Sequence, residues 1–79
     1  MIKMTDIKNV IDTLISMGNE VSEVASTDTF RIYKLIPADD KCCIDWEEFT
    51  LIRQIGDIWN ISTDVKTMKP IVYFAVNEG

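Results

Sequence analysis

The sequence predicts a small α+β domain in which two helices cover one face of a four-stranded antiparallel sheet. Two segments show the apolar spacing of helices, and two strand-like runs follow each of them. The length of 79 residues fits a single domain spanning residues 1–79. Hydrophobic residues make up 47% of the chain and charged residues 27%, which is typical of a globular protein rather than a disordered one.

The first helical segment lies close to the N-terminus. Apolar residues from Ile7 to Ile15 recur at spacings of three and four, which places them on one face of a helix. Thr5 or Asp6 is expected to cap the start of this helix, because a side-chain oxygen there can accept from an orphan backbone N–H. Gly18 is expected to close its end in a left-handed conformation.

The second helical segment carries a capping-box pattern. Asp45 suits the N-cap, and Glu48 stands three residues later, where its side chain can reach back to the N-cap backbone. Ile44 and Phe49 flank the cap as a hydrophobic staple would. Gly56 ends the apolar periodicity and is expected to end the helix.

The strand-like runs are rich in β-branched and aromatic residues, which favour strands. Pro70 stands at the head of the last run, where a strand residue need not donate to the ladder. The four expected strands cover residues 20–26, 30–36, 58–62 and 71–76.

Similar features recur in the two halves of the chain. The recurring features are the triplet Ser-Thr-Asp at 26–28 and 62–64, the glycines Gly18 and Gly56, and the tyrosines Tyr33 and Tyr73. Together with the shared element order they indicate an internal αββ repeat, with chance as the alternative. The order αββαββ is a circular permutation of the ferredoxin-like arrangement, while other two-layer topologies and a domain-swapped hairpin dimer stay open.

The two apolar strand runs predict an interface. Two helices cover only one sheet face, and the other face of an antiparallel sheet is normally polar. In residues 30–36 and 71–76 both faces are apolar, so we expect a homodimer through the open face or an edge strand, or a docked partner protein. Tyr33 and Leu35 are the candidate contact residues. Cover by loops and the N-terminal residues is the alternative.

Catalysis, cofactors and metals are not expected. The chain has no histidine, which removes the usual general base and the commonest metal ligand. It has no glycine-rich phosphate loop, and its acids lack the spacing of a calcium loop. Cys42 and Cys43 are adjacent and lack the spacing of a redox or zinc motif, so they are interpreted as reduced thiols.

An acidic stretch around the second helix is the most distinctive local feature. Its residues are Asp39, Asp40, Asp45, Glu47 and Glu48, with Trp46 among them. These acids are interpreted as helix caps and first-turn charges, which suit the helix dipole. The alternative is a partner-binding patch formed by Asp39, Asp40, Trp46, Glu47 and Glu48, with Trp46 as an aromatic anchor.

The net charge of −5, from 13 acidic and 8 basic residues, disfavours direct contact with nucleic acid. No apolar run resembles a signal peptide or membrane span, so we expect a cytoplasmic protein. The favoured function is a small acidic, non-catalytic protein-interaction module that self-associates. The alternative is a phage-type inhibitor of a host nucleic-acid-binding defence complex. That alternative requires acids of both halves to converge, such as Glu20, Glu23, Asp28, Asp39, Asp40, Asp57 and Asp64.

Overall fold

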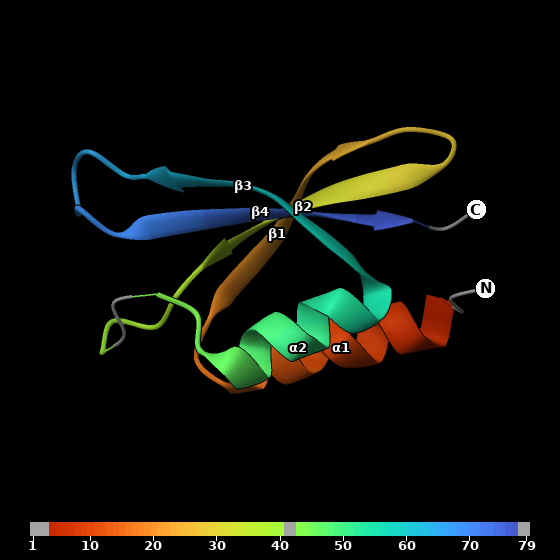
Figure 1. The fold of residues 1–79 in the computed structure, drawn as a ribbon, viewed down its shortest axis with the longest axis horizontal. Coiled ribbons are helices and arrows are strands. Elements are labelled where there is room, and N and C mark those ends of the chain that lie inside the picture. Colours follow the sequence, from red (N-terminus) through yellow and green to blue (C-terminus); the bar gives the residue numbers. More distant parts are fainter. Residues whose placement is uncertain (1–3, 41–42, 78–79) are drawn as a thin grey trace.

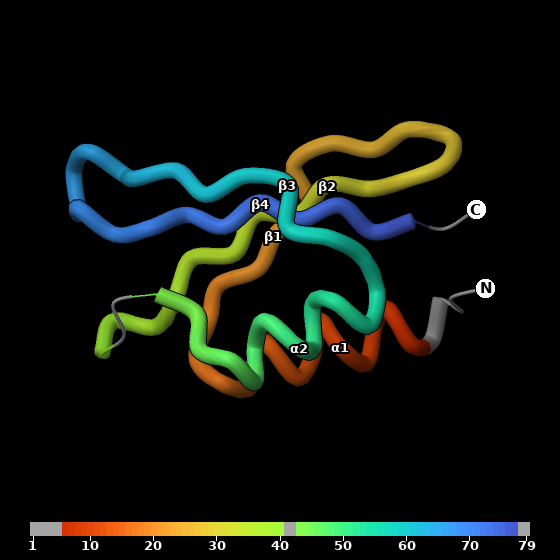
Figure 2. The backbone as a smooth tube through the Cα atoms, viewed as in Figure 1, coloured from red at the N-terminus to blue at the C-terminus, as the bar shows by residue number. Residues whose placement is uncertain are grey.

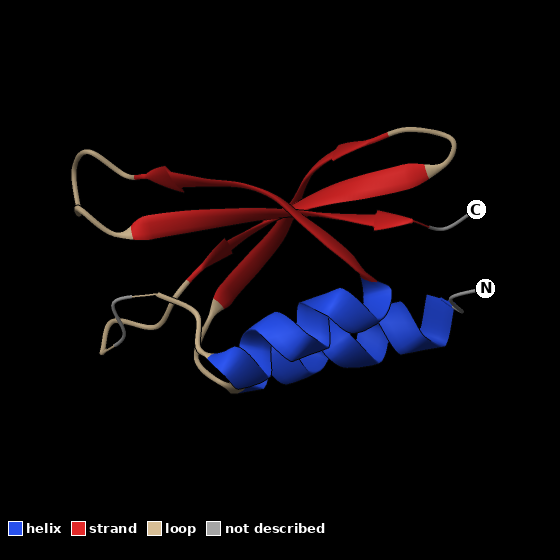
Figure 3. Cartoon of the chain, in the orientation of Figure 1, coloured by secondary structure: helices blue, strands red, loops and turns tan. Residues whose placement is uncertain are grey.

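The computed structural model describes residues 4–40 and 43–77. Two helices and four strands follow each other in the order α1 (Met4–Ser16), β1 (Glu20–Ser26), β2 (Phe30–Ile36), α2 (Trp46–Ile55), β3 (Gly56–Thr63) and β4 (Pro70–Asn77). Both helices lie on the same side of the sheet (Figures 1 and 3). The predicted two-layer αββαββ architecture is therefore confirmed.

The sheet is antiparallel throughout and has the strand order β1-β2-β4-β3. Each αββ half supplies one hairpin, and the second strand of each hairpin lies at the centre of the sheet (Figure 2). This is the arrangement that an αββ repeat predicts. Because β2 and β4 run antiparallel, the turn between β1 and β2 and the turn between β3 and β4 lie at opposite ends of the molecule (Figure 2).

The two strand tyrosines are not equivalent, although their spacing, which resembles that of the two glycines and the two Ser-Thr-Asp triplets, suggested that they were. Tyr33 pairs with Phe74 and is buried, whereas Tyr73 pairs with Lys34 and is half-buried on the other face. Side chains alternate between faces along a strand, so a shift of one residue moves a side chain to the other face. The repeat is therefore visible in the order of the elements and not in the tyrosines.

The core lies between the helices and the sheet. The rings of Tyr33 and Phe74 stack there with centroids 5.5 Å apart. The buried apolar residues are Ile7, Val10 and Leu14 of α1, Ile52 and Ile55 of α2, Tyr33 and Leu35 of β2, and Val72, Phe74 and Val76 of β4. Alternate residues of the two central strands thus fill one side of the sheet, as the period of a strand requires.

The helix ends follow the sequence signals, with one exception. The Asp45 carboxylate accepts the Glu48 backbone N–H at 3.0 Å and Glu48 accepts the Asp45 N–H at 3.0 Å, which confirms the capping box. Gly18 has the expected positive φ, of 97°. The helix α1 begins at Met4, so Thr5 and Asp6 lie inside its first turn and are not N-caps.

Gly56 is needed for a reason that the apolar periodicity of the helix does not indicate. It ends α2 and begins β3 with an extended backbone that any residue can adopt, at φ −179°. A Cβ atom at this position would overlap the carbonyl oxygen of Ala75 on β4. Glycine is therefore needed because the two backbones approach closely, and not because of its conformational freedom.

Candidate functional site

The face of the sheet that carries Tyr33 and Leu35 is covered by the helices. Their exposed fractions are 8% and 0%, and both belong to the core. These two residues were expected to touch a partner, but in this fold they are inaccessible to one. The expectation placed them on the wrong side because alternation separates the two faces of a strand without saying which one the helices cover.

The opposite side of the sheet, here called the open face, carries the other half of the central strands. No element among residues 4–40 and 43–77 packs on it (Figures 1 and 3). Cross-strand pairs such as Ile32 with Ala75 and Lys34 with Tyr73 define it. Its central residues are Phe30, Ile32, Lys34 and Ile36 of β2 with Ile71, Tyr73 and Ala75 of β4. All of them except Lys34 are apolar or aromatic.

Trp59 extends the open face towards the edge of the sheet. Its ring meets that of Tyr73 edge-on, with centroids 6.4 Å apart. It stands at a register shift in β3, between Ile58 and Asn60, and β1 has a similar shift between Glu23 and Ala25. Both edge strands are therefore bulged, and bulges hinder edge-to-edge pairing of sheets. The open face is a better candidate for association than either edge.

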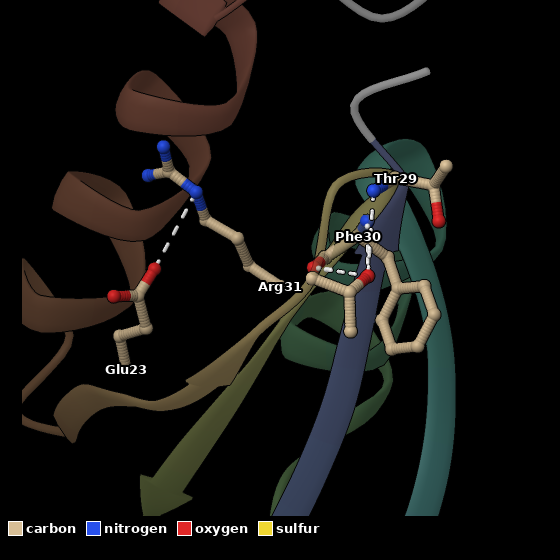
Figure 4. A network of polar contacts seen from close by, with 5 residues as sticks. Glu23, Thr29, Phe30 and Arg31 are labelled. Carbon is tan, nitrogen blue, oxygen red and sulfur yellow. Dashed lines mark hydrogen bonds and ion pairs between the residues drawn. The ribbon is translucent and has the colours of Figure 1, made fainter.

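The turn between β1 and β2 fixes one end of the open face. The Thr27 hydroxyl accepts the backbone N–H groups of Thr29 and Phe30 at 3.3 and 3.2 Å (Figure 4). Arg31 and Glu23 form an ion pair, at 3.4 Å, on the other side of the hairpin from the Phe30 ring (Figure 4). The turn thus presents the exposed Phe30 ring on the open face.

The acidic stretch around α2 divides into separate roles. Asp39 forms an ion pair with Lys69, and the hydrogen bond and positive charge of Lys69 lower the pKa of the Asp39 carboxyl. Asp40 and Glu47 are exposed, and the Asp45 carboxylate caps α2. Glu47 lies in the first turn of α2, where its charge suits the helix dipole, so among the described acids of this stretch only Asp40 is exposed with no structural role.

Glu48 is fully buried and is not a surface residue. Besides capping α2, its carboxylate accepts a hydrogen bond from the side-chain amide of Asn19, which also donates to the Leu14 carbonyl at 2.9 Å. Asn19 thereby joins the end of α1 to the start of α2. Sequence reasoning missed it; its position directly after the helix-ending Gly18 was the available signal.

An apolar groove opens between α2 and β3, with a volume of about 310 Å³. Trp46 stacks on Phe49, with ring centroids 5.3 Å apart, and is 77% exposed. The lining residues of this α2–β3 groove are Ile44, Asp45, Trp46, Phe49, Ile58 and Ile61. The sequence suggested Trp46 as an anchor but not the two β3 isoleucines, because their placement depends on the register shift at Trp59.

The acids that an inhibitor would use are spread over the molecule. Asp28 lies in the turn between β1 and β2, and Asp64 lies at the turn between β3 and β4, at the opposite end (Figure 2). Asp57 forms an ion pair with Arg53, and Glu23 pairs with Arg31. Asp28 and Asp64 therefore do not share one surface.

The described residues hold no group of three or more His, Cys, Asp or Glu side chains placed to bind a metal. Cys43 is a free, exposed thiol, while Cys42 lies outside the described residues. In the same part of the chain, neither helix has the length and apolarity needed to cross a membrane. Comparison with protein-family models, curated proteins and solved structures finds no match for the chain.

Proposed function

We propose that this chain is a small acidic, non-catalytic protein-interaction module that forms a homodimer through its open face. The observation that carries the proposal is the apolar character of both central strands on the side away from the helices. The second face of an antiparallel sheet is usually polar when it meets water. A second copy of the chain supplies an apolar face of the same shape and chemistry.

The size of the open face suits such an interface. Four strands about 4.8 Å apart, each rising about 3.4 Å per residue, make a face of roughly 19 by 25 Å. Its projected area is about 480 Å², and protruding side chains raise the accessible area above this value. A standard interface buries about 800 Å² of each partner. The sheet, extended by Trp59 and Phe30, supplies most of that area.

The charges on the open face are compatible with two-fold packing. Lys34 lies at the centre of the face, opposite Tyr73. Glu20 pairs with Ile36, which places this acid on the same face but on the outer strand β1, whereas Asp57 is already paired with Arg53. In a symmetric pair, the aliphatic stem of Lys34 covers apolar surface and its ammonium reaches towards Glu20 of the other copy.

The module has no catalytic role in this proposal, because its buried polar groups serve the ends of the helices. Glu48 and Asn19 are the buried polar residues of the described chain, and they bind each other and nearby backbone groups. The chain also has no histidine to act as a general base. Its chemistry favours binding over catalysis.

Light scattering over a range of concentrations tests the proposal. We expect the wild-type mass to reach twice the 9.0 kDa of one chain. Ile32→Glu and Tyr73→Glu place a charge on the open face and should remain monomeric at concentrations where the wild type is dimeric. The control Val65→Glu makes the same charge change at an exposed position in the turn between β3 and β4, and it should dimerise.

Far-UV circular dichroism shows whether each variant is folded. A wild type that stays monomeric throughout would overturn the proposal. So would folded open-face variants that dimerise as the wild type does.

A further inference from the structure

We propose that the α2–β3 groove binds a segment of a second protein that places a bulky apolar side chain next to an arginine or lysine. The groove lies on the helical side of the sheet, because Ile58 and Ile61 pair with the buried residues Phe74 and Val72 of β4. It is therefore separate from the open face. The inference concerns a different protein and does not depend on self-association.

The register shift in β3 creates the groove. In a regular strand, residues three apart point to opposite faces. Because Trp59 is an extra residue in the pairing, Ile58 and Ile61 instead lie opposite Phe74 and Val72, which are two apart on β4. Both isoleucines consequently face α2, while the ring of Trp59 contacts Tyr73 on the other side. One bulge thus shapes both surfaces.

The groove leaves apolar side chains exposed to solvent, although burying them would stabilise a domain of this size. Ile61 is 52% exposed and Trp46 is 77% exposed, because the groove that both line is shallow and open to solvent. A volume of about 310 Å³ is at the lower limit for ligand pockets, which range from about 300 to 1,000 Å³. It suits a single bulky side chain of a peptide better than a large ligand.

The charges around the groove specify the residue beside that side chain. Among the residues that the structure describes, Asp45 is the only charged one that lines it, and the exposed Glu47 follows Trp46 on α2. No lysine or arginine of the described chain lines the groove. The net charge of −5 adds a negative field that attracts cationic segments and repels anionic ones.

Besides the negative electrostatic field of the chain, Trp46 offers the cation an aromatic surface to bind. One face of its indole stacks on Phe49, and the side chain is otherwise largely exposed. An ammonium or guanidinium over the free face of an indole gains cation–π attraction. Because the guanidinium is planar and weakly hydrated, arginine should bind better than lysine.

An NMR titration of the ¹⁵N-labelled protein tests the groove with three capped hexapeptides. The first, Gly-Gly-Leu-Arg-Gly-Gly, carries both proposed features. The second replaces arginine with glutamate, and the third replaces leucine with alanine. We expect saturable shifts from the first peptide at residues 44–49 and 58–61, with at least fivefold weaker binding of the other two.

Two variants at exposed apolar side chains locate the site. Trp46→Ala should weaken binding of the leucine–arginine peptide at least fivefold, whereas Val65→Ala, which trims an exposed side chain in the turn between β3 and β4, should leave it unchanged. The proposal is overturned if no saturable shifts occur, if the glutamate peptide binds equally well, or if folded Trp46→Ala binds as the wild type does. Shifts confined to the open face would also overturn it.

Discussion

The buried contact between Asn19 and Glu48 should contribute measurably to the stability of the fold. Both residues are buried, and the Glu48 carboxylate accepts from the Asn19 amide and the Asp45 backbone. Hydrogen bonds to a charged group contribute about 1.5–3 kcal/mol each. A domain of 79 residues has a total stability of roughly 4–12 kcal/mol, so this contact matters for folding.

Glu48→Gln keeps the shape of the side chain but presents an amide where the carboxylate accepted from Asn19. We expect a loss of about 1.5–3 kcal/mol in the free energy of unfolding. A double-mutant cycle that combines Glu48→Gln with Asn19→Ala should give a coupling energy of about 1–3 kcal/mol between the two side chains. Glu47→Gln makes the same charge change at an exposed neighbouring position, and its effect should stay within about 0.5 kcal/mol.

Urea denaturation followed by far-UV circular dichroism measures these energies. All proteins must be compared at one concentration, because dimerisation would make stability depend on concentration. A coupling energy below about 0.5 kcal/mol would refute the reasoning, since residues joined by a buried charged hydrogen bond should not behave independently. If Glu48→Gln and Glu47→Gln lose the same free energy of unfolding, the effect comes instead from the change in net charge.

Three further perturbations test the fold and its electrostatics. Gly56→Ala should cost about 1–3 kcal/mol, because the added methyl overlaps the backbone of β4; an unchanged urea midpoint would contradict that close approach. Ile52→Ala should cost about 2–5 kcal/mol at a fully buried position, against less than about 1 kcal/mol for Ile15→Ala on the exposed face of α1. The pKa of Asp39 is lowered by Lys69, so the ion pair persists until the pH falls below the ordinary carboxyl value of 3.8, where protonation removes its stabilising effect. An NMR titration should therefore show the Asp39 pKa rising towards 3.8 in Lys69→Met, and an unchanged value would exclude Lys69 as the cause.

The elements were predictable because local signals specify them. The β1 and β2 strands match the predicted ranges 20–26 and 30–36, and the capping box of Asp45 and Glu48 fixes the start of α2. The start of α1 was not predictable in the same way. Thr5 and Asp6 are good cap residues, but apolar contacts can extend a helix past a possible cap when the preceding residues also favour helix.

The surfaces were less predictable because they depend on pairing between distant residues. Alternation showed that β2 has two apolar faces, but only the packing of the helices shows that Tyr33 and Leu35 lie in the core. The groove depends on a bulge at Trp59, and no local pattern marks which residue of a strand is extra. The roles of Asn19 and Glu48 likewise arise from residues far apart in sequence.

The two proposed surfaces lie on opposite sides of one sheet, so they can be occupied together. A dimer joined by its open faces carries both helical layers on the outside, which leaves the two α2–β3 grooves accessible (Figure 1). A partner with two leucine–arginine segments on a linker of matching length would then bind the second site intramolecularly, at an effective concentration near millimolar. The wild type should bind such a tandem peptide more tightly than the single peptide, whereas monomeric Tyr73→Glu should bind both about equally. Calorimetric titration of both peptides into both proteins measures the difference. A tandem advantage that persists in the monomeric variant would mean that bivalency does not come from the open-face dimer.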